Sequence, residues 1–146
     1  MKEISEMTPG KQVEYASRIL LPNRRFGEYL DVMKQVLHDD VHYIDPVHEF
    51  RGRAGVLEML EKYVPRTAND KFKFELLVDT ESEVVWRWTI ALKIRFTWFE
   101  FIIHGLVHAR VEGGKIFYQR EYYDPMESIS VIPLLGPIYK LVLRLG

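Results

Sequence analysis

Two carboxylic acids are the residues best suited by type and spacing to carry chemistry. Asp45 closes a short alternating segment, Val41 to Asp45, that ends at Pro46. Tyr43 precedes Asp45 by two residues, so alternation along a strand puts both side chains on one face. Glu121 lies in a second alternating segment, 116 to 123. If both carboxyls face one apolar interior, their pKa values are driven apart, and they can act as an acid/base pair.

Other common chemistries lack the residues that they require. The chain has no cysteine, which excludes thiolate nucleophiles, disulfides and Cys-based metal sites. His104 and His108 are four residues apart, but on a strand this spacing puts them about 13 Å apart, too far to share a metal. Gly113-Gly114 indicates a hairpin turn, and no Gly-rich phosphate loop or G-x-S-x-G elbow occurs. We therefore predict neither a metal nor another cofactor.

The elements that must position these carboxyls begin with helices. Thr8-Pro9 is typical of a helix start, with Thr8 as the capping residue and Pro9 in the first turn. Apolar residues follow at helical spacing as far as Pro22-Asn23. A second helical pattern runs from Phe26 to Leu37 and is expected to end at 38–40. The strand 41–45 follows, and 50–53 is predicted to be a turn. A short amphipathic helix then ends at Pro65.

From Lys71 the hydrophobic period changes from 3.6 to 2. The strongest alternation places six large apolar residues on one face of a long strand: Trp86, Trp88, Ile90, Leu92, Ile94 and Phe96. Further strands are predicted at about 99–111 and 116–123, joined by the turn 112–115. Helices followed by an antiparallel meander indicate an α+β protein, not a parallel βα fold.

Several motifs in this pattern resemble those of the SnoaL-like and ketosteroid-isomerase-like proteins of the NTF2-like superfamily. They are Tyr43-Ile44-Asp45-Pro46-Val47, the Arg51-Gly52 pair, the strand 83–89 and the hairpin closed by 120–124. The resemblance covers roughly 26–124. It implies a cone in which N-terminal helices pack on a strongly curved, mostly antiparallel sheet around an apolar cavity. We interpret 1–146 as one such domain, with 129–146 as an apolar C-terminal extension.

The family register implies which side chains line that cavity. Asp45 and Tyr43 face inward from the first strand, and Glu121 faces inward from the last. The expected ligand-pocket residues are Trp86, Trp88, Ile90, Val107, Gln119 and Tyr123. A slip of one residue would invert any strand's set.

The resemblance also implies a reaction type. In the isomerases of this family the Asp of the Asp-Pro-Val motif is the general base, which here is Asp45. The second, protonated Asp of those isomerases has no counterpart, because the alignment puts Val107 in its place, or His108 if the register is off by one. The nearest tyrosines in the early helices are Tyr15 and Tyr29. Asp45, Glu121 and Tyr43 are therefore the candidate catalytic residues of a cofactor-independent isomerase, cyclase or lyase acting on an apolar carbonyl compound.

Non-catalytic interpretations stay open. Asp45 before Pro46 is also typical of a side chain that accepts hydrogen bonds from turn amides. Glu121 is compatible with a simple ion pair to arginine. The alternative to an enzyme is then a ligand-binding or dimeric interaction module. The tryptophans at 86 and 88 suit the core and a pocket wall better than a surface for stacking bases.

Composition limits the partners. The formal net charge is -1, hydrophobic residues make up 47% and aromatic residues 13% of 146 residues. We expect no nucleic acid partner, a cytoplasmic protein without a signal peptide, and a homodimer formed through the outer face of the sheet, as the resemblance implies. For the apolar segment 131–145 we favour a lid or packing role over association with a membrane surface, because it has only two basic residues.

Overall fold

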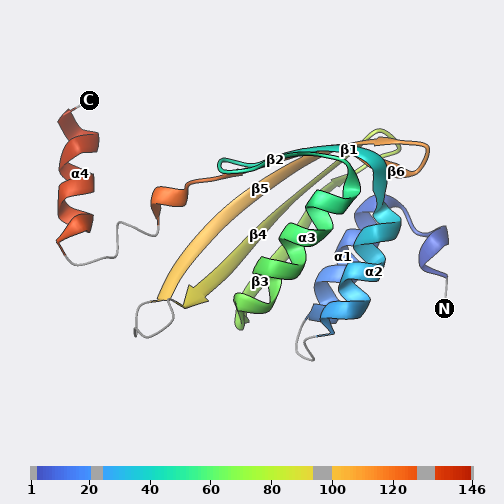
Figure 1. Ribbon diagram of the computed structural model, residues 1–146, viewed down its shortest axis with the longest axis horizontal. Helices are drawn as coiled ribbons and strands as arrows, with labels where there is room; N and C mark the ends of the chain where they lie inside the picture. The colour runs from blue at the N-terminus through green and yellow to red at the C-terminus, as the bar shows by residue number, and fades with distance from the viewer. Residues whose placement is uncertain (1–2, 21–24, 94–99, 128–133, 146) are drawn as a thin grey trace.

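The protein is built from a layer of helices against one curved sheet. The structure is a computed structural model that describes residues 3–20, 25–93, 100–127 and 134–145, without the side chains of 66–71, 92, 93 and 101. The described elements are η1 (Ile4–Glu6), α1 (Pro9–Leu20), α2 (Phe26–Val36), β1 (Leu37–Ile44), β2 (Glu49–Arg51), α3 (Arg53–Tyr63), η2 (Val64–Arg66), β3 (Thr67–Asp79), β4 (Glu83–Lys93), β5 (Glu100–Glu112), β6 (Lys115–Tyr123) and α4 (Leu135–Leu145). Figure 1 shows α1, α2 and α3 together beneath the concave face of the sheet.

The described strands form one six-stranded sheet in the order β2-β1-β6-β5-β4-β3. Every neighbouring pair is antiparallel except β1 and β6, which run parallel. This confirms the α+β, mostly antiparallel fold predicted from the sequence. The parallel pair has a consequence for function, because it brings the strand that ends before Asp45 alongside the strand that carries Glu121.

The predicted hairpin between the last two strands is present. Gly113 and Gly114 both have positive φ values, 57° and 74°. Two such residues in succession form the tight turn whose twist matches antiparallel strands. The turn fixes the pairing of β5 with β6 that follows, including Ala109 with Gln119 and Val107 with Glu121.

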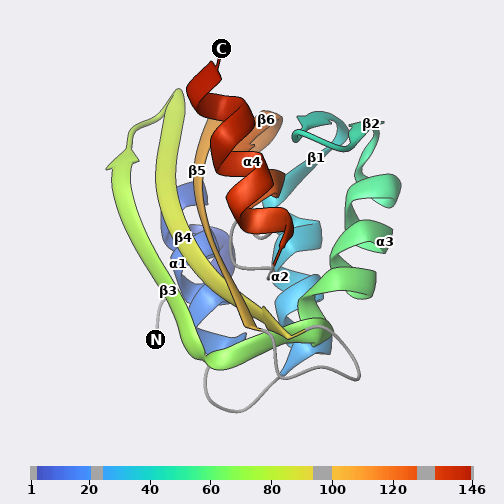
Figure 2. The same cartoon turned by 90° about the vertical axis from the view of Figure 1, so that its left-hand side faces the viewer.

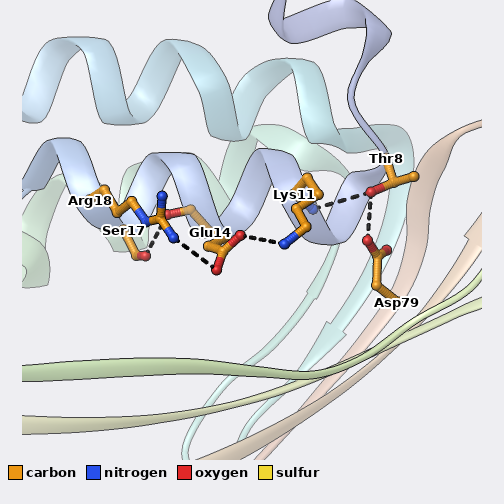
Figure 3. A network of polar contacts seen from close by, with 6 residues as sticks. All are labelled: Thr8, Lys11, Glu14, Ser17, Arg18 and Asp79. Atoms are coloured by element: carbon orange, nitrogen blue, oxygen red, sulfur yellow. Dashed lines mark hydrogen bonds and ion pairs between the residues drawn. The ribbon is translucent and has the colours of Figure 1, made fainter.

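The first helix is held to the sheet through its N-terminus. The Thr8 hydroxyl accepts a hydrogen bond from the Lys11 amide at 3.4 Å and donates to Asp79 Oδ2 at 2.6 Å. Figure 3 shows this contact, together with ion pairs from Lys11 and Arg18 to Glu14 along the exposed side of α1. The predicted capping by Thr8 is therefore confirmed, and it ties the start of α1 to the end of β3.

One boundary was wrong. We predicted that the second helix ends at 38–40, whereas β1 begins at Leu37 and runs through these residues. Tertiary contacts explain the difference, since Leu37 is fully buried and pairs with Ile116. Arg53 also forms an ion pair with Asp39 at 2.6 Å and donates to the carbonyl of Leu37. These partners are remote in the sequence and overrule the local helical pattern.

The predicted turn at 50–53 also needs correction. Glu49–Arg51 forms the short edge strand β2, which pairs with β1, and α3 starts immediately afterwards at Arg53. The breaks predicted at Pro22-Asn23, the strand positions Ile94, Phe96 and Phe99, and residues 129–133 of the C-terminal extension lie outside the described residues.

The core lies between the helices and the sheet. It includes Val32 and Val36 from α2, Val56 from α3, and Val84 and Trp86 from β4. Val107, Ala109 and Ile116 close it from the other side, and all three are fully buried. This packing holds β1, β5 and β6 in the register that positions the candidate site.

Candidate active site

The pairing of β1 with β6 brings the predicted carboxyls together. Tyr43 is opposite Gln119 and Ile44 opposite Arg120, so the next residue on each strand is Asp45 and Glu121. The Tyr43 hydroxyl donates to Asp45 Oδ2 at 2.9 Å, and the negative charge of Asp45 raises the pKa of Glu121. All three residues predicted to be catalytic therefore share one cluster.

Asp45 is deeply buried and firmly held. Its Oδ1 accepts hydrogen bonds from the backbone amides of Val47 at 2.8 Å and His48 at 2.7 Å. The imidazole Nδ1 of His48 lies 3.0 Å from Oδ2. Only 3% of the Asp45 side chain is exposed. These contacts match the turn-forming role that was the alternative to catalysis, and they leave little of this carboxyl free to meet a ligand.

Glu121 has a different environment. As a residue it is half-buried, but its carboxyl is enclosed by protein, and this burial raises its pKa to about 7 from the usual 4.5. The hydrogen bond from Gln119 opposes this increase, while the negative charge of Asp45 adds to it. Gln119 Nε2 donates to Glu121 Oε1 at 3.0 Å. A carboxyl with a pKa near 7 can both accept and release a proton at neutral pH.

Two further tyrosines lie near the carboxyl pair. Burial raises the pKa of Tyr29, and the charge of Glu121 raises it further. Burial likewise raises the pKa of Tyr123, and the charges of Asp45 and Glu121 raise it further. Both phenols therefore stay protonated at neutral pH and are available as hydrogen-bond donors. Tyr15, the other tyrosine considered from the sequence, instead donates to Glu28 at 3.3 Å.

An aromatic wall continues from the carboxyl pair along the sheet. The rings of Trp88 and Tyr123 lie 5.8 Å apart. The indole of Trp88 lies over Gly105, where an added Cβ would come within 2.3 Å of the ring. Trp88 can lie flat in this position only because its partner on β5 has no side chain.

The predicted pocket residues divide into two groups. Trp86, Val107 and Gln119 are buried, the first two within the core. Trp88, Ile90 and Tyr123 are half-buried and keep some accessible surface on the concave face. Solvent therefore reaches this part of the inner face, next to Glu121.

A surface groove lies elsewhere, at the hairpin end of the sheet. It is lined by the N-terminal segment 3–9, by α1 residues such as Gln12, and by the turns at 79–81 and 113–115. None of the predicted catalytic or ligand-pocket residues borders it. We base the functional assignment on the carboxyl cluster, because there Tyr43 donates to Asp45 and burial raises the pKa of the Glu121 carboxyl to about 7.

Among the side chains that the structure describes, no group of three or more His, Asp or Glu residues is arranged to hold a metal ion. His104 instead lies 3.0 Å from the Thr89 hydroxyl, and His108 lies 3.1 Å from Glu83. Both histidines are on the outer face of the sheet.

Sequence reasoning missed the part played by His48. Its imidazole contacts Asp45 and stacks on Phe50, with ring centroids 5.6 Å apart. The signal was present in the spacing, because a side chain three residues after an Asp in a turn can return to that Asp. Tyr29 was considered but could not be placed, since its approach to Glu121 depends on how α2 packs across the sheet.

Comparison with known proteins defines the class to which this architecture belongs. An NTF2-like protein of unknown function from Cytophaga hutchinsonii superposes with a TM-score of 0.59 over 86% of this chain and 96% of its own, at 18% identity. A protein assigned as a SnoaL-like polyketide cyclase from Mesorhizobium loti gives 0.61 over 80% and 100%, at 15% identity. An LEH-like epoxide hydrolase from M. tuberculosis gives 0.56 over 92% and 97%, at 21% identity. The fold is that of the NTF2-like superfamily.

Within this class the family is also defined. The model of the SnoaL-like domain matches residues 27–119, which is more than half of the chain, and the chain belongs to that family. The resemblance seen in the Asp-Pro-Val motif is thus confirmed. No protein with a curated description matches the sequence.

Proposed function

We propose that the protein is a cofactor-independent enzyme that transfers a proton on a small apolar carbonyl compound, as an isomerase or cyclase would. The observation that carries the proposal is the carboxyl cluster at β1 and β6, in which Tyr43 donates to Asp45 and the charge of Asp45 acts on the buried Glu121 carboxyl, beside an accessible aromatic wall. The fold alone supports no particular activity, because it hosts many functions.

The two carboxyls have different roles in this proposal. Asp45 was the predicted general base, but its oxygens are occupied by turn amides, His48 and Tyr43. Glu121, with a pKa of about 7, is better suited to remove the proton next to the carbonyl and return it elsewhere on the substrate. Asp45 keeps Tyr43 oriented and raises the pKa of Glu121 through its charge.

Tyr29 is the proposed donor to the substrate's carbonyl oxygen. Its pKa is raised by burial and by Glu121, so its hydroxyl keeps its proton. A protonated phenol that donates to an enolate oxygen stabilises the charge that develops in the transition state. The half-buried Trp88 and Tyr123 provide an apolar surface for the rest of the substrate.

Deuterium exchange tests the proposal without knowledge of the natural substrate. A panel of apolar ketones is incubated with the protein in D₂O, and loss of the proton next to the carbonyl is followed by NMR. We expect exchange that rises with pH as Glu121 loses its proton near pH 7. Glu121→Gln should reduce it about 100-fold or more, and Tyr29→Phe should reduce it less severely.

Glu112→Gln is the matched control, because Glu112 is exposed at the far end of β5. It should leave the exchange rate unchanged. Activity retained in Glu121→Gln would reject Glu121 as the base. If none of the ketones exchanges but several bind, the alternative of a non-catalytic ligand-binding module is favoured.

We also propose that the protein forms a homodimer through the outer face of β4, β5 and β6. Exposed apolar side chains on this face support the proposal, namely Ile102, Leu106 and Tyr122. They alternate with polar residues such as Arg110 and Arg120, which lie over tyrosine rings. Light scattering tests it, and a monomer at micromolar concentration would argue against it.

A further inference from the structure

The C-terminal helix α4 stands apart from the rest of the described structure. Figure 1 places it beyond the end of the sheet, away from α1, α2 and α3, and Figure 2 shows it from that side, in front of the strands. Among the described elements, none packs extensively against α4. One contact to the body is a long hydrogen bond of 3.4 Å from the Tyr139 hydroxyl to Asp124. The helix therefore does not cover the concave face as a lid.

Nearly the whole apolar surface of α4 is exposed. Six large apolar residues are 50–79% exposed: Leu135, Ile138, Leu141, Val142, Leu143 and Leu145. With 3.6 residues per turn, these side chains and Tyr139 occupy one wide arc of the helix. Large apolar groups left in water on an isolated helix are unfavourable unless something else covers them.

The charges of α4 identify the kind of surface that fits. The helix has two charged residues, Lys140 and Arg144, and both are basic. They are four residues apart and so lie on one side, opposite the apolar arc. An apolar arc with a basic opposite face is the pattern of a helix that lies flat in the interface of a bilayer.

We propose that α4 binds the surface of an anionic lipid membrane. The apolar arc enters the boundary between headgroups and acyl chains, Tyr139 lies at headgroup level, and Lys140 with Arg144 contacts the lipid phosphates. The net charge of the chain is -1, so attraction by the whole molecule does not account for such binding. The helix has 11 residues, about 16 Å in length, and lies on the membrane without crossing it.

From the sequence, a lid or packing role for this segment was preferred to association with a membrane surface, and the proposal made here reverses that preference. The reason is the position of α4, which no sequence pattern showed. Within the described ranges, no helix is long and apolar enough to span a bilayer. The inference is independent of the proposed chemistry at Glu121.

Vesicle co-sedimentation with the full chain tests the proposal. The probes are vesicles of phosphatidylcholine alone and of phosphatidylcholine mixed with phosphatidylserine. We expect binding to the mixed vesicles that weakens as salt is added. Lys140→Gln with Arg144→Gln should weaken it about 25-fold, since each basic residue contributes roughly fivefold. Ile138→Ser with Val142→Ser should weaken it about tenfold or more.

Lys34→Gln with Lys62→Gln is the matched control, because it removes the same charge from exposed positions on α2 and α3. It should bind as the unchanged protein does. Far-UV circular dichroism and thermal unfolding should match for all variants, as α4 contributes little to the core.

Three results would overturn the proposal. The first is no binding to the mixed vesicles. The second is an equal loss in the Lys34/Lys62 control. The third is a dimer, seen by light scattering, that dissociates in the Ile138/Val142 variant, because a second copy would then cover the apolar arc.

Discussion

Asp45 directly follows β1 and Glu121 lies on the parallel strand β6, yet the two carboxyls have different surroundings and therefore different roles. The turn amides of Val47 and His48 hold the Asp45 carboxylate in one orientation. Glu121 receives a hydrogen bond from Gln119, and its pKa is raised by burial and by the charge of Asp45. Of the two acidic groups in the cluster, Asp45 is therefore held in one orientation, while Glu121 has a pKa raised to about 7.

Replacing Asp45 by Asn should lower the pKa of Glu121. The amide keeps an oxygen for the turn amides but removes the negative charge that raises this pKa. Carbon-13 NMR titration of the Glu side chains measures the effect, with an apparent value of about 7 expected in the unchanged protein. Asp40→Asn, on the exposed part of β1, serves as the control and should cause no shift. An unchanged or higher Glu121 pKa in Asp45→Asn would contradict this account.

At the scale of elements, the packing between β4 and β5 depends on a tryptophan on one strand opposite a glycine on the other. Trp88 and Gly105 are paired in register, and the indole fills the space that a side chain would need. The aromatic wall of the candidate site thus depends on a glycine in the middle of a strand, a position that normally disfavours it.

Gly105→Ala should destabilise the protein by about 1–3 kcal/mol. The added Cβ would lie 2.3 Å from the Trp88 ring, so the indole or the strand must move. Urea unfolding gives the free energy, and tryptophan fluorescence reports the displaced ring. Gly27→Ala is the matched control, because its added Cβ meets no atom within 4 Å and it lies in a helix. It should be neutral or stabilising by up to about 1 kcal/mol, and equal effects of the two variants would reject this explanation.

The elements were predictable from the sequence to the extent that local pattern governs them. The alternation from Trp86 along β4, the glycine pair at 113–114 and the cap at Thr8 act over short distances, and each was predicted correctly. The start of β1 was wrong because Ile116 and Arg53, remote in sequence, draw Leu37 into the strand. The detachment of α4 had no local signal, since an apolar helix has the same pattern whether it packs on the protein or projects from it.

The sequence indicated which residues lie in the candidate site better than it indicated what each of them does. Strand alternation and the family register predict that Asp45, Tyr43 and Glu121 face one interior, and the structure places them near one another; their catalytic roles stay predictions. Which carboxyl has the pKa near 7 depends on backbone amides at 47 and 48 and on enclosure by α2 and β6, and these are properties of the packed molecule. The same packing explains why Tyr29 could not be placed from its position in the chain.

At the scale of the whole molecule, the helices and the sheet share one core, so the enclosed Glu121 affects global stability. Its pKa is raised in the folded state to about 7, against the usual 4.5 that it regains on unfolding. Between these values the folded protein holds a proton that the unfolded chain has released. Raising the pH through this window therefore favours unfolding, and stability is greatest below about 4.5 as far as this group is concerned.

Glu121→Gln should remove this dependence on pH. Relative to the variant, the unchanged protein should lose up to about 3 kcal/mol of stability between pH 4.5 and pH 7, the energy that corresponds to its raised pKa. Urea unfolding of both proteins at a series of pH values measures it, and subtraction cancels the other titrating groups. Glu112→Gln, which is exposed, should run parallel to the unchanged protein. A difference between Glu121→Gln and the unchanged protein that stays constant from pH 4.5 to 8 would mean that Glu121 is ionised throughout, and it would remove the basis for Glu121 as a proton acceptor near neutral pH.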